Sequence, residues 1–127
     1  MHSRNLLEAF RFAFSGLWHA LRTQRNMRIQ LLVAVGVVVM GLWLRLSADQ
    51  WAVLAATSGL VLVSEMVNTV VEGIVDLVCP DYHPLAKTVK DVMAGGVVLA
   101  AIVAVVVGLL ILGPPLWTRL TRCYVGQ

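Results

Sequence analysis

Charged residues are scarce in this chain of 127 residues: 13% are Asp, Glu, Lys or Arg, whereas 59% are hydrophobic. Soluble domains have about 25% charged and about 45–50% apolar residues. A chain of this length cannot bury so much apolar surface in one core, so the composition indicates an integral membrane protein. The net charge is +3, but the basic residues are scattered between apolar segments. This pattern is typical of membrane-surface anchors and argues against a nucleic-acid partner.

Several catalytic and structural motifs are also missing. Cys79 and Cys123 are the only cysteines and lie far apart, so neither a disulfide framework nor a zinc site is expected. The sequence contains no GxxxxGK[ST] phosphate loop, no GxGxxG and no GxSxG. The first strongly apolar run begins only near Ile29, after an Arg-rich segment, so no signal peptide is predicted. Any phosphate chemistry must therefore depend on carboxylates, a metal ion and lysine at the membrane surface.

The N-terminal segment, residues 4–26, predicts an amphipathic helix that lies on a membrane surface. Apolar residues recur every three or four positions, and arginines fall mainly on other faces. A helix packed against other helices of a bundle is the alternative. The apolar stripe comprises Leu7, Phe10, Phe14, Leu17 and Leu21.

Three longer apolar segments predict transmembrane helices, so the expected fold is an all-α membrane protein with three spans and a surface helix in a single domain. The second span is long enough to cross roughly 30 Å of hydrocarbon and protrude by about two turns. Ser47–Gln50 is expected to form a polar turn before it, and Gly113-Pro114-Pro115 is expected to end the third. The three spans cover residues 29–46, 51–78 and 92–112.

The distribution of lysine and arginine predicts the orientation of these spans. One side of the predicted membrane receives seven basic residues and the other receives three, which favours a cytoplasmic N-terminus and a cytoplasmic 79–91 loop. Three tryptophans lie near predicted boundaries on the opposite side, as in an aromatic belt. The seven are Arg4, Arg11, Arg22, Arg25, Arg28, Lys87 and Lys90; the three are Arg45, Arg119 and Arg122; the tryptophans are Trp43, Trp51 and Trp117.

The second span ends in the polar stretch SEMVNTVVEGIVD, residues 64–76. Glu65, Glu72 and Asp76 are seven and four residues apart, so they form one column on a helix, bordered by Asn68. Charge at membrane depth is costly, and stacked carboxylates need a proton or a cation beside them. The column therefore predicts a functional site. A polar interface between helices, or side chains that reach the surface, is the alternative; it suits Asp76 better than the deeper Glu65.

The loop that follows reads CPDYHPLAKTVKDVMAGG, residues 79–96. Lys87, Lys90 and Asp91 occupy the first turns of the next helix, where lysines facing the carboxylates would favour phosphate and metal binding. A solvated loop with ordinary cytoplasmic lysines is the alternative. Tyr82 and His83 are also consistent with interface residues.

Together, E-x-x-N-T-x-x-E-x-x-x-D and YHPLAK-x-x-KD-x-x-AG resemble the prokaryotic diacylglycerol kinase family, in particular its undecaprenol-phosphorylating branch. The resemblance covers most of the chain. It implies a homotrimer with active sites shared between protomers, in the bacterial inner (cytoplasmic) membrane. It also implies transfer of phosphate from ATP, with Mg²⁺, to a membrane lipid hydroxyl. Undecaprenol is the expected substrate, and diacylglycerol the alternative.

The resemblance also implies roles for individual residues. Glu65 matches the base that acts on the lipid hydroxyl, and Asn68 its helical partner. Gln24 stands where well-known members have a second metal-binding glutamate, so weaker Mg²⁺ binding is predicted. Glu72 is expected to bind the metal ion and the nucleotide, and Ala94, with Glu65, is expected to contact the lipid. The other residues expected to contact the nucleotide are Asp81, Tyr82, His83, Lys90 and Asp91.

Two other functions are alternatives to a lipid kinase. An ion-coupled transporter needs a polar path across the membrane, but residues 31–44 and 97–112 contain no polar side chain. A non-catalytic assembly subunit is the second rival, and Gln24 keeps it open.

Overall fold

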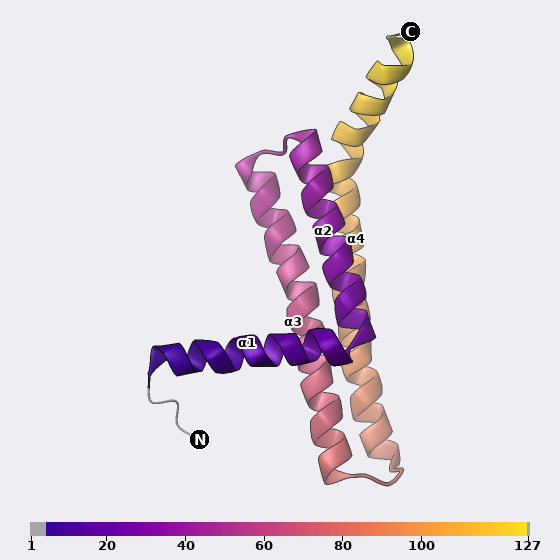
Figure 1. Ribbon diagram of the computed structural model, residues 1–127. Helices are drawn as coiled ribbons and strands as arrows, with labels where there is room; N and C mark the ends of the chain where they lie inside the picture. The colour runs from indigo at the N-terminus through magenta and orange to yellow at the C-terminus, as the bar shows by residue number, and fades with distance from the viewer. Residues whose placement is uncertain (1–4, 127) are drawn as a thin grey trace.

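The structure is a computed structural model that describes residues 5–126. The described chain folds into four α-helices and contains no strand. Helices α2, α3 and α4 run side by side as a bundle, and α1 projects sideways from it (Figure 1). The α2–α3 turn and the C-terminus lie at one end of the bundle, and the α3–α4 loop lies at the other. The helices are α1 (Leu6–Thr23), α2 (Arg25–Leu44), α3 (Ala48–Val78) and α4 (Pro84–Val125).

Helix α1 is the amphipathic helix that the sequence predicts. Asn5 caps it by accepting a hydrogen bond from the backbone N–H of Glu8 at 3.0 Å. It ends at Gln24, whose extended backbone turns the chain into α2. Ala20 is its only buried residue, so this chain does not pack α1 into its own bundle. The surface location remains a prediction, and Arg4, at the predicted start, lies outside the described residues.

The α2–α3 turn is tighter than the sequence indicates. Arg45 takes a left-handed backbone conformation with φ of 55° and ends α2. The prediction that Ser47–Gln50 forms a polar turn is wrong, because Ser47 is the N-cap of α3 and the helix begins at Ala48. Ser47 and Gln50 form a capping box, in which each side chain accepts a hydrogen bond from the other residue's backbone N–H. The polar residues thus start the helix.

Helix α4 does not stop at Gly113-Pro114-Pro115, as the sequence suggests, but continues to Val125. A proline keeps a φ compatible with a helix but removes one backbone hydrogen bond, so it bends the helix more readily than it ends it. The last turns of α4 lean away from the bundle (Figure 1). They stay in contact through Arg119, whose guanidinium lies 5.0 Å from the ring centre of Trp43. Trp43 near the end of α2 and Trp51 near the start of α3 lie on either side of the α2–α3 turn.

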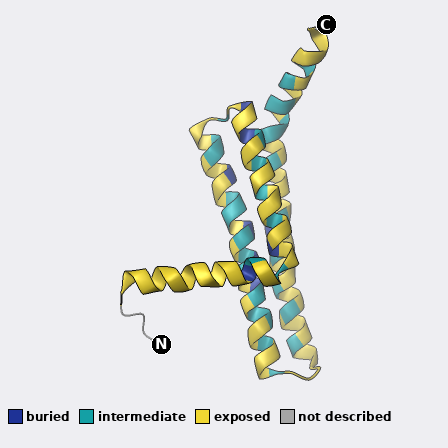
Figure 2. Cartoon of the chain, viewed as in Figure 1, coloured by how far each residue is buried: buried dark blue, intermediate teal, exposed yellow. Residues whose placement is uncertain are grey.

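The bundle has little core of its own. Most of its apolar side chains are exposed in the isolated chain (Figure 2). Helices α2, α3 and α4 are each long and apolar enough to span a membrane. These features confirm the predicted all-α membrane fold and a multi-pass topology, in which lipid or partner chains must cover the exposed faces. Among the described residues, the buried apolar side chains are Ala20, Met27, Leu44, Leu54, Val61 and Ala100.

Candidate functional site

The most deeply placed polar side chain of the described chain is a carboxylate in the middle of the bundle. Glu65 on α3 is only 3% exposed. Gln30 on α2 donates a hydrogen bond from Nε2 to Glu65 Oε2 at 3.3 Å. A buried carboxyl group without a donor would be strongly destabilising, so Gln30 supplies part of its solvation. Sequence reasoning missed Gln30, although a lone amide at the start of an apolar span was a visible signal.

One turn nearer the α3–α4 loop, Asn68 and Glu72 form a second amide–carboxylate pair. Asn68 Nδ2 donates to Glu72 Oε1 at 3.1 Å. Asn68 is 8% exposed and Glu72 is half-buried, so the pair is shielded from solvent on the Asn68 side. The Asn68 Oδ1 atom is buried and has no hydrogen-bond partner among residues 5–126. The predicted column therefore contains a buried acceptor oxygen that the described part of the chain does not satisfy.

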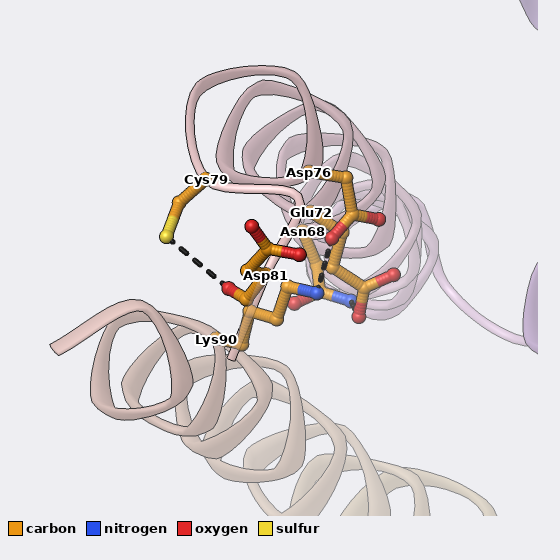
Figure 3. A network of polar contacts seen from close by, with 6 residues as sticks. All are labelled: Asn68, Glu72, Asp76, Cys79, Asp81 and Lys90. Atoms are coloured by element: carbon orange, nitrogen blue, oxygen red, sulfur yellow. Dashed lines mark hydrogen bonds and ion pairs between the residues drawn. The ribbon is translucent and has the colours of Figure 1, made fainter. Parts of the chain in front are cut away.

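The end of the column faces a lysine from the neighbouring helix. Lys90 on α4 reaches across the hairpin and forms an ion pair with Asp76 on α3 (Figure 3). Lys87, by contrast, pairs with Asp91 on its own helix at 2.5 Å. Of the two lysines predicted to face the carboxylates, only Lys90 does so, and Lys90 and Asp91 point to different partners. Both ion pairs are substantially exposed, so they contribute little to stability.

The short loop between α3 and α4 holds three residues predicted to contact nucleotide. The Asp81 carbonyl oxygen accepts a hydrogen bond from Cys79 Sγ at 3.3 Å (Figure 3). His83 is the N-cap of α4, and its Nδ1 accepts from the Leu85 N–H at 3.1 Å. Tyr82 is exposed. Asp81 lies beside Lys90 (Figure 3), and Tyr82 and His83 follow it in the same loop at the open end of the hairpin.

Two further predicted residues lie apart from this network. Ala94 is exposed on α4, one turn beyond Lys90. Gln24 is half-buried at the α1–α2 junction, and its side chain makes no capping hydrogen bond. No hydrogen bond joins Gln24 to Glu72 in the described part of the chain. The geometry therefore leaves the predicted metal role of Gln24 untested.

The oxygen donors of the column are compatible with a hard cation. Mg²⁺ commonly uses one or two carboxylates and completes its shell with water and substrate phosphates. Glu72 offers a carboxylate, and one of its oxygens accepts a hydrogen bond from Asn68 Nδ2. Residues 5–126 contain no cluster of three His, Cys, Asp or Glu side chains that could hold a metal ion. The oxygen donors of the column would suit a metal ion that also has phosphate oxygens among its ligands.

Comparison with known proteins places these residues in a family. The family described as prokaryotic diacylglycerol kinase matches residues 11–112. The chain belongs to this family. The whole polar column and the first turns of α4 lie inside the matched region, so the sequence resemblance is confirmed. The last turns of α4, beyond residue 112, lie outside it.

The similar proteins are named for two different lipid substrates. A diacylglycerol kinase of Synechocystis is 50% identical over 113 residues, which cover 88% of this chain and 65% of the relative. An undecaprenol kinase of Bacillus subtilis is 36% identical over 86% of this chain and 89% of the relative. A diacylglycerol kinase of Escherichia coli is 29% identical over 80% of this chain and 83% of the relative. The chain thus spans slightly less than two thirds of the Synechocystis relative and most of the other two.

Proposed function

We propose that this chain is a lipid kinase that transfers the γ-phosphoryl group of ATP to the hydroxyl group of a membrane lipid. One observation carries the proposal. A single helix face connects a buried carboxyl group, Glu65, with a lysine-paired carboxylate, Asp76, at the open end of the hairpin. A lipid hydroxyl and a soluble phosphate donor can meet along such a face, because one end is apolar and the other is open.

In this proposal Glu65 acts on the lipid hydroxyl. Its carboxylate accepts the hydroxyl proton as the oxygen forms its bond to the γ-phosphorus and the bond to the leaving ADP oxygen breaks. Gln30 holds one carboxylate oxygen, Oε2, and leaves the other to act as the base. Lys90 places its ammonium group near the phosphate oxygens, where positive charge stabilises phosphoryl transfer. Its exposed pairing with Asp76 is weak enough to be exchanged for a phosphate.

Glu72 is the proposed ligand of Mg²⁺, with Gln24 as a neutral second candidate. When bound, the ion would offset negative charge on the phosphate oxygens. The Asn68 amide already donates to Glu72 and so orients the carboxylate. Asp81, Tyr82, His83 and Asp91 then frame the nucleotide from the loop and from α4.

The proposed setting is the bacterial inner (cytoplasmic) membrane, with the N-terminus and the α3–α4 loop in the cytoplasm, where ATP is available. A homotrimer with shared sites would cover part of the apolar surface that each chain exposes. It would also bring a second chain to the open flank of the polar column. These assignments rest on the family and on the distribution of basic residues.

Undecaprenol is the proposed substrate, and diacylglycerol is the second candidate. The YHPLAK loop and a match that covers 89% of the Bacillus subtilis undecaprenol kinase favour the first. The 50% identity to the Synechocystis diacylglycerol kinase favours the second. Both lipids present a primary hydroxyl to Glu65, so the site chemistry is the same for both.

The test is phosphate transfer from labelled ATP. Purified protein in mixed micelles is offered undecaprenol and diacylglycerol in parallel, with and without Mg²⁺. We expect Mg²⁺-dependent labelling that is stronger for undecaprenol. Preferred labelling of diacylglycerol would reverse the substrate choice and keep the mechanism. Folded protein that labels neither lipid and does not bind ATP would instead support the non-catalytic assembly subunit.

A further inference from the structure

The last turns of α4, residues 113–125, extend beyond the part of the helix that a membrane span needs. Helix α4 has 42 residues, which is about 63 Å of helix and twice the roughly 30 Å of a hydrocarbon core. The predicted span ends at Leu112, so the last turns reach about 20 Å farther. They lie outside residues 11–112, which the family model matches. The matched region therefore assigns them no role.

Pro114 and Pro115 indicate where this helix leaves the hydrocarbon. A proline has no N–H, so these two positions cannot donate to the carbonyls of Leu110 and Ile111, four residues earlier. Hydrocarbon offers no donor to such a carbonyl, whereas water at the membrane surface does. The prolines also allow the last turns to lean away from the bundle (Figure 1). Residues 110–115 are therefore best placed at the boundary between hydrocarbon and water.

The last turns present an exposed apolar face with two aromatic side chains. Trp117, Leu120 and Tyr124 are three and four residues apart, so they fall within a sector of about 60° on the helix. Trp117 is 71% exposed and Tyr124 is 89% exposed. Tryptophan and tyrosine favour the level of the lipid headgroups, where the ring is shielded and its polar atom is hydrated. This face is therefore suited to the surface of a membrane.

Two arginines border this apolar face. Neither Arg119 nor Arg122 forms an ion pair among residues 5–126, and no Asp or Glu follows Asp91 in the sequence. Arg122 is exposed, whereas Arg119 lies over the ring of Trp43 at 5.0 Å. A guanidinium group that stacks by its face keeps N–H donors at its edge, and these suit the oxygens of a phosphate group. Both arginines can therefore bind an anionic headgroup.

We propose that residues 113–125 lie along the membrane surface at the α2–α3 end of the bundle and bind anionic phospholipids through Arg119 and Arg122. The apolar face then rests among the upper parts of the lipid chains, and the arginines reach the phosphate groups. Because α4 is continuous with this segment, its last turns start at the lipid surface. The inference does not depend on the proposed kinase function.

The charge at this end of the bundle favours lipid over a second copy of the chain. The α2–α3 turn and the last turns of α4 together contain three arginines and one acidic residue. A second copy would bring the same positive surplus and repel the first, whereas an anionic headgroup layer would complement it. Headgroup binding also gives a reason for basic residues on the side of the membrane that their overall distribution disfavours. The residues are Arg45, Arg119, Arg122 and Asp49.

Quenching by brominated lipids tests the proposal. The full chain with Cys79→Ser carries a fluorophore on Cys123, which is exposed; a serine hydroxyl can still donate to the Asp81 carbonyl. The protein is placed in nanodiscs of equal parts phosphatidylcholine and phosphatidylglycerol, with bromine on one lipid or on the other. We expect stronger quenching by brominated phosphatidylglycerol, with a preference of up to about five-fold for each arginine. The preference should fall as the salt concentration rises.

Three variants assign the preference to particular side chains. Arg119→Gln and Arg122→Gln should each lower it by up to about five-fold, and the double variant should remove it. Lys87→Gln is the matched control, because it removes one positive charge from the other end of the same helix. This control should leave the quenching at Cys123 unchanged. The comparison of the two brominated lipids with both arginines in place stands even if an arginine variant fails to fold.

Three results would overturn the proposal. Equal quenching by the two lipids, or a preference that survives loss of both arginines, would show that these side chains do not select anionic headgroups. A fluorophore that neither lipid quenches and that aqueous iodide quenches fully would show that the last turns stand in water. A fluorophore shielded from both lipid and iodide, with Cys123–Cys123 crosslinks between chains, would show that a second copy covers the segment.

Discussion

Replacement of Gly41 by alanine tests the packing of the α2–α3 turn. A Cβ atom at position 41 would lie 2.6 Å from Trp51 Cη2 and 2.9 Å from Trp51 Cζ2. Carbon atoms make their best contact at about 3.5–4.0 Å, so the overlap is close to one ångström. Overpacking of this kind costs about 1–3 kcal/mol, and roughly 1 kcal/mol is recovered because alanine favours a helix over glycine. We expect a net loss of up to about 2 kcal/mol in the free energy of unfolding.

The assay is thermal unfolding in detergent, followed as the fraction of protein that elutes as a folded species. A loss of this size lowers Tm by up to roughly 8 °C in a chain of this length. Gly36→Ala is the matched control on the same helix, because its added Cβ would meet nothing within 4 Å. This control should leave Tm unchanged or raise it slightly. Kinase activity per folded molecule should be normal in both variants, because the turn lies at the opposite end of the bundle from the α3–α4 loop (Figure 1).

A second substitution identifies the cause. Trp51→Phe removes both ring atoms that approach position 41, so Gly41→Ala should cost less in a Trp51→Phe background than in the unaltered chain. The coupling between the two substitutions measures the clash directly. If Gly41→Ala is as stable as Gly36→Ala, the close approach of Trp51 to α2 is wrong. A large loss that persists in the Trp51→Phe background would place the strain elsewhere in the turn.

Three further predictions concern the polar column. Glu65→Gln should lower kcat by about 10²-fold or more with little change in KM for ATP, because it removes a base and leaves the hairpin intact; steady-state kinetics check this, and near-normal kcat would refute it. Lys90→Met should reduce activity far more than Lys87→Met, because Lys90 pairs with Asp76 on α3 whereas Lys87 pairs with Asp91 on its own helix. Both ion pairs are exposed, so neither variant should lower Tm measurably. Equal losses of activity would contradict the predicted difference between the two lysines. Gln24→Glu should lower the Mg²⁺ concentration needed for half-maximal activity, because it adds a carboxylate. If that Mg²⁺ concentration does not change, residue 24 is not a ligand of the metal ion.

Two buried amide oxygens lie near the polar column. Gln30 and Asn68 each donate to a carboxylate, and each has a buried oxygen without a hydrogen-bond partner among residues 5–126. Native chains rarely bury acceptors in this way without a reason. These two positions are therefore where the polar groups of the isolated chain are least well satisfied.

The sequence by itself determined the class of the protein and most of the candidate site. Low charge and long apolar runs required a membrane fold, because no core of this length could bury them. The spacing of Glu65, Glu72 and Asp76 required one helix face, because helix geometry is local and fixed at about 100° per residue. The motifs that carried the resemblance lie within the same stretch and the loop after it.

Only the tertiary structure decided which side chains from different helices meet. The pairing of Gln30 with Glu65 joins positions 35 residues apart, and no local pattern encodes that distance. The choice of Lys90 rather than Lys87 as the partner of Asp76 depends on the rotation of α4 against α3. The path of α4 through Pro114 and Pro115 was also misjudged, because a proline weakens a helix locally whereas packing along the bundle decides whether the helix continues. Helix propensity and periodicity act over a few residues, but a site built between helices depends on contacts that are set when the bundle packs.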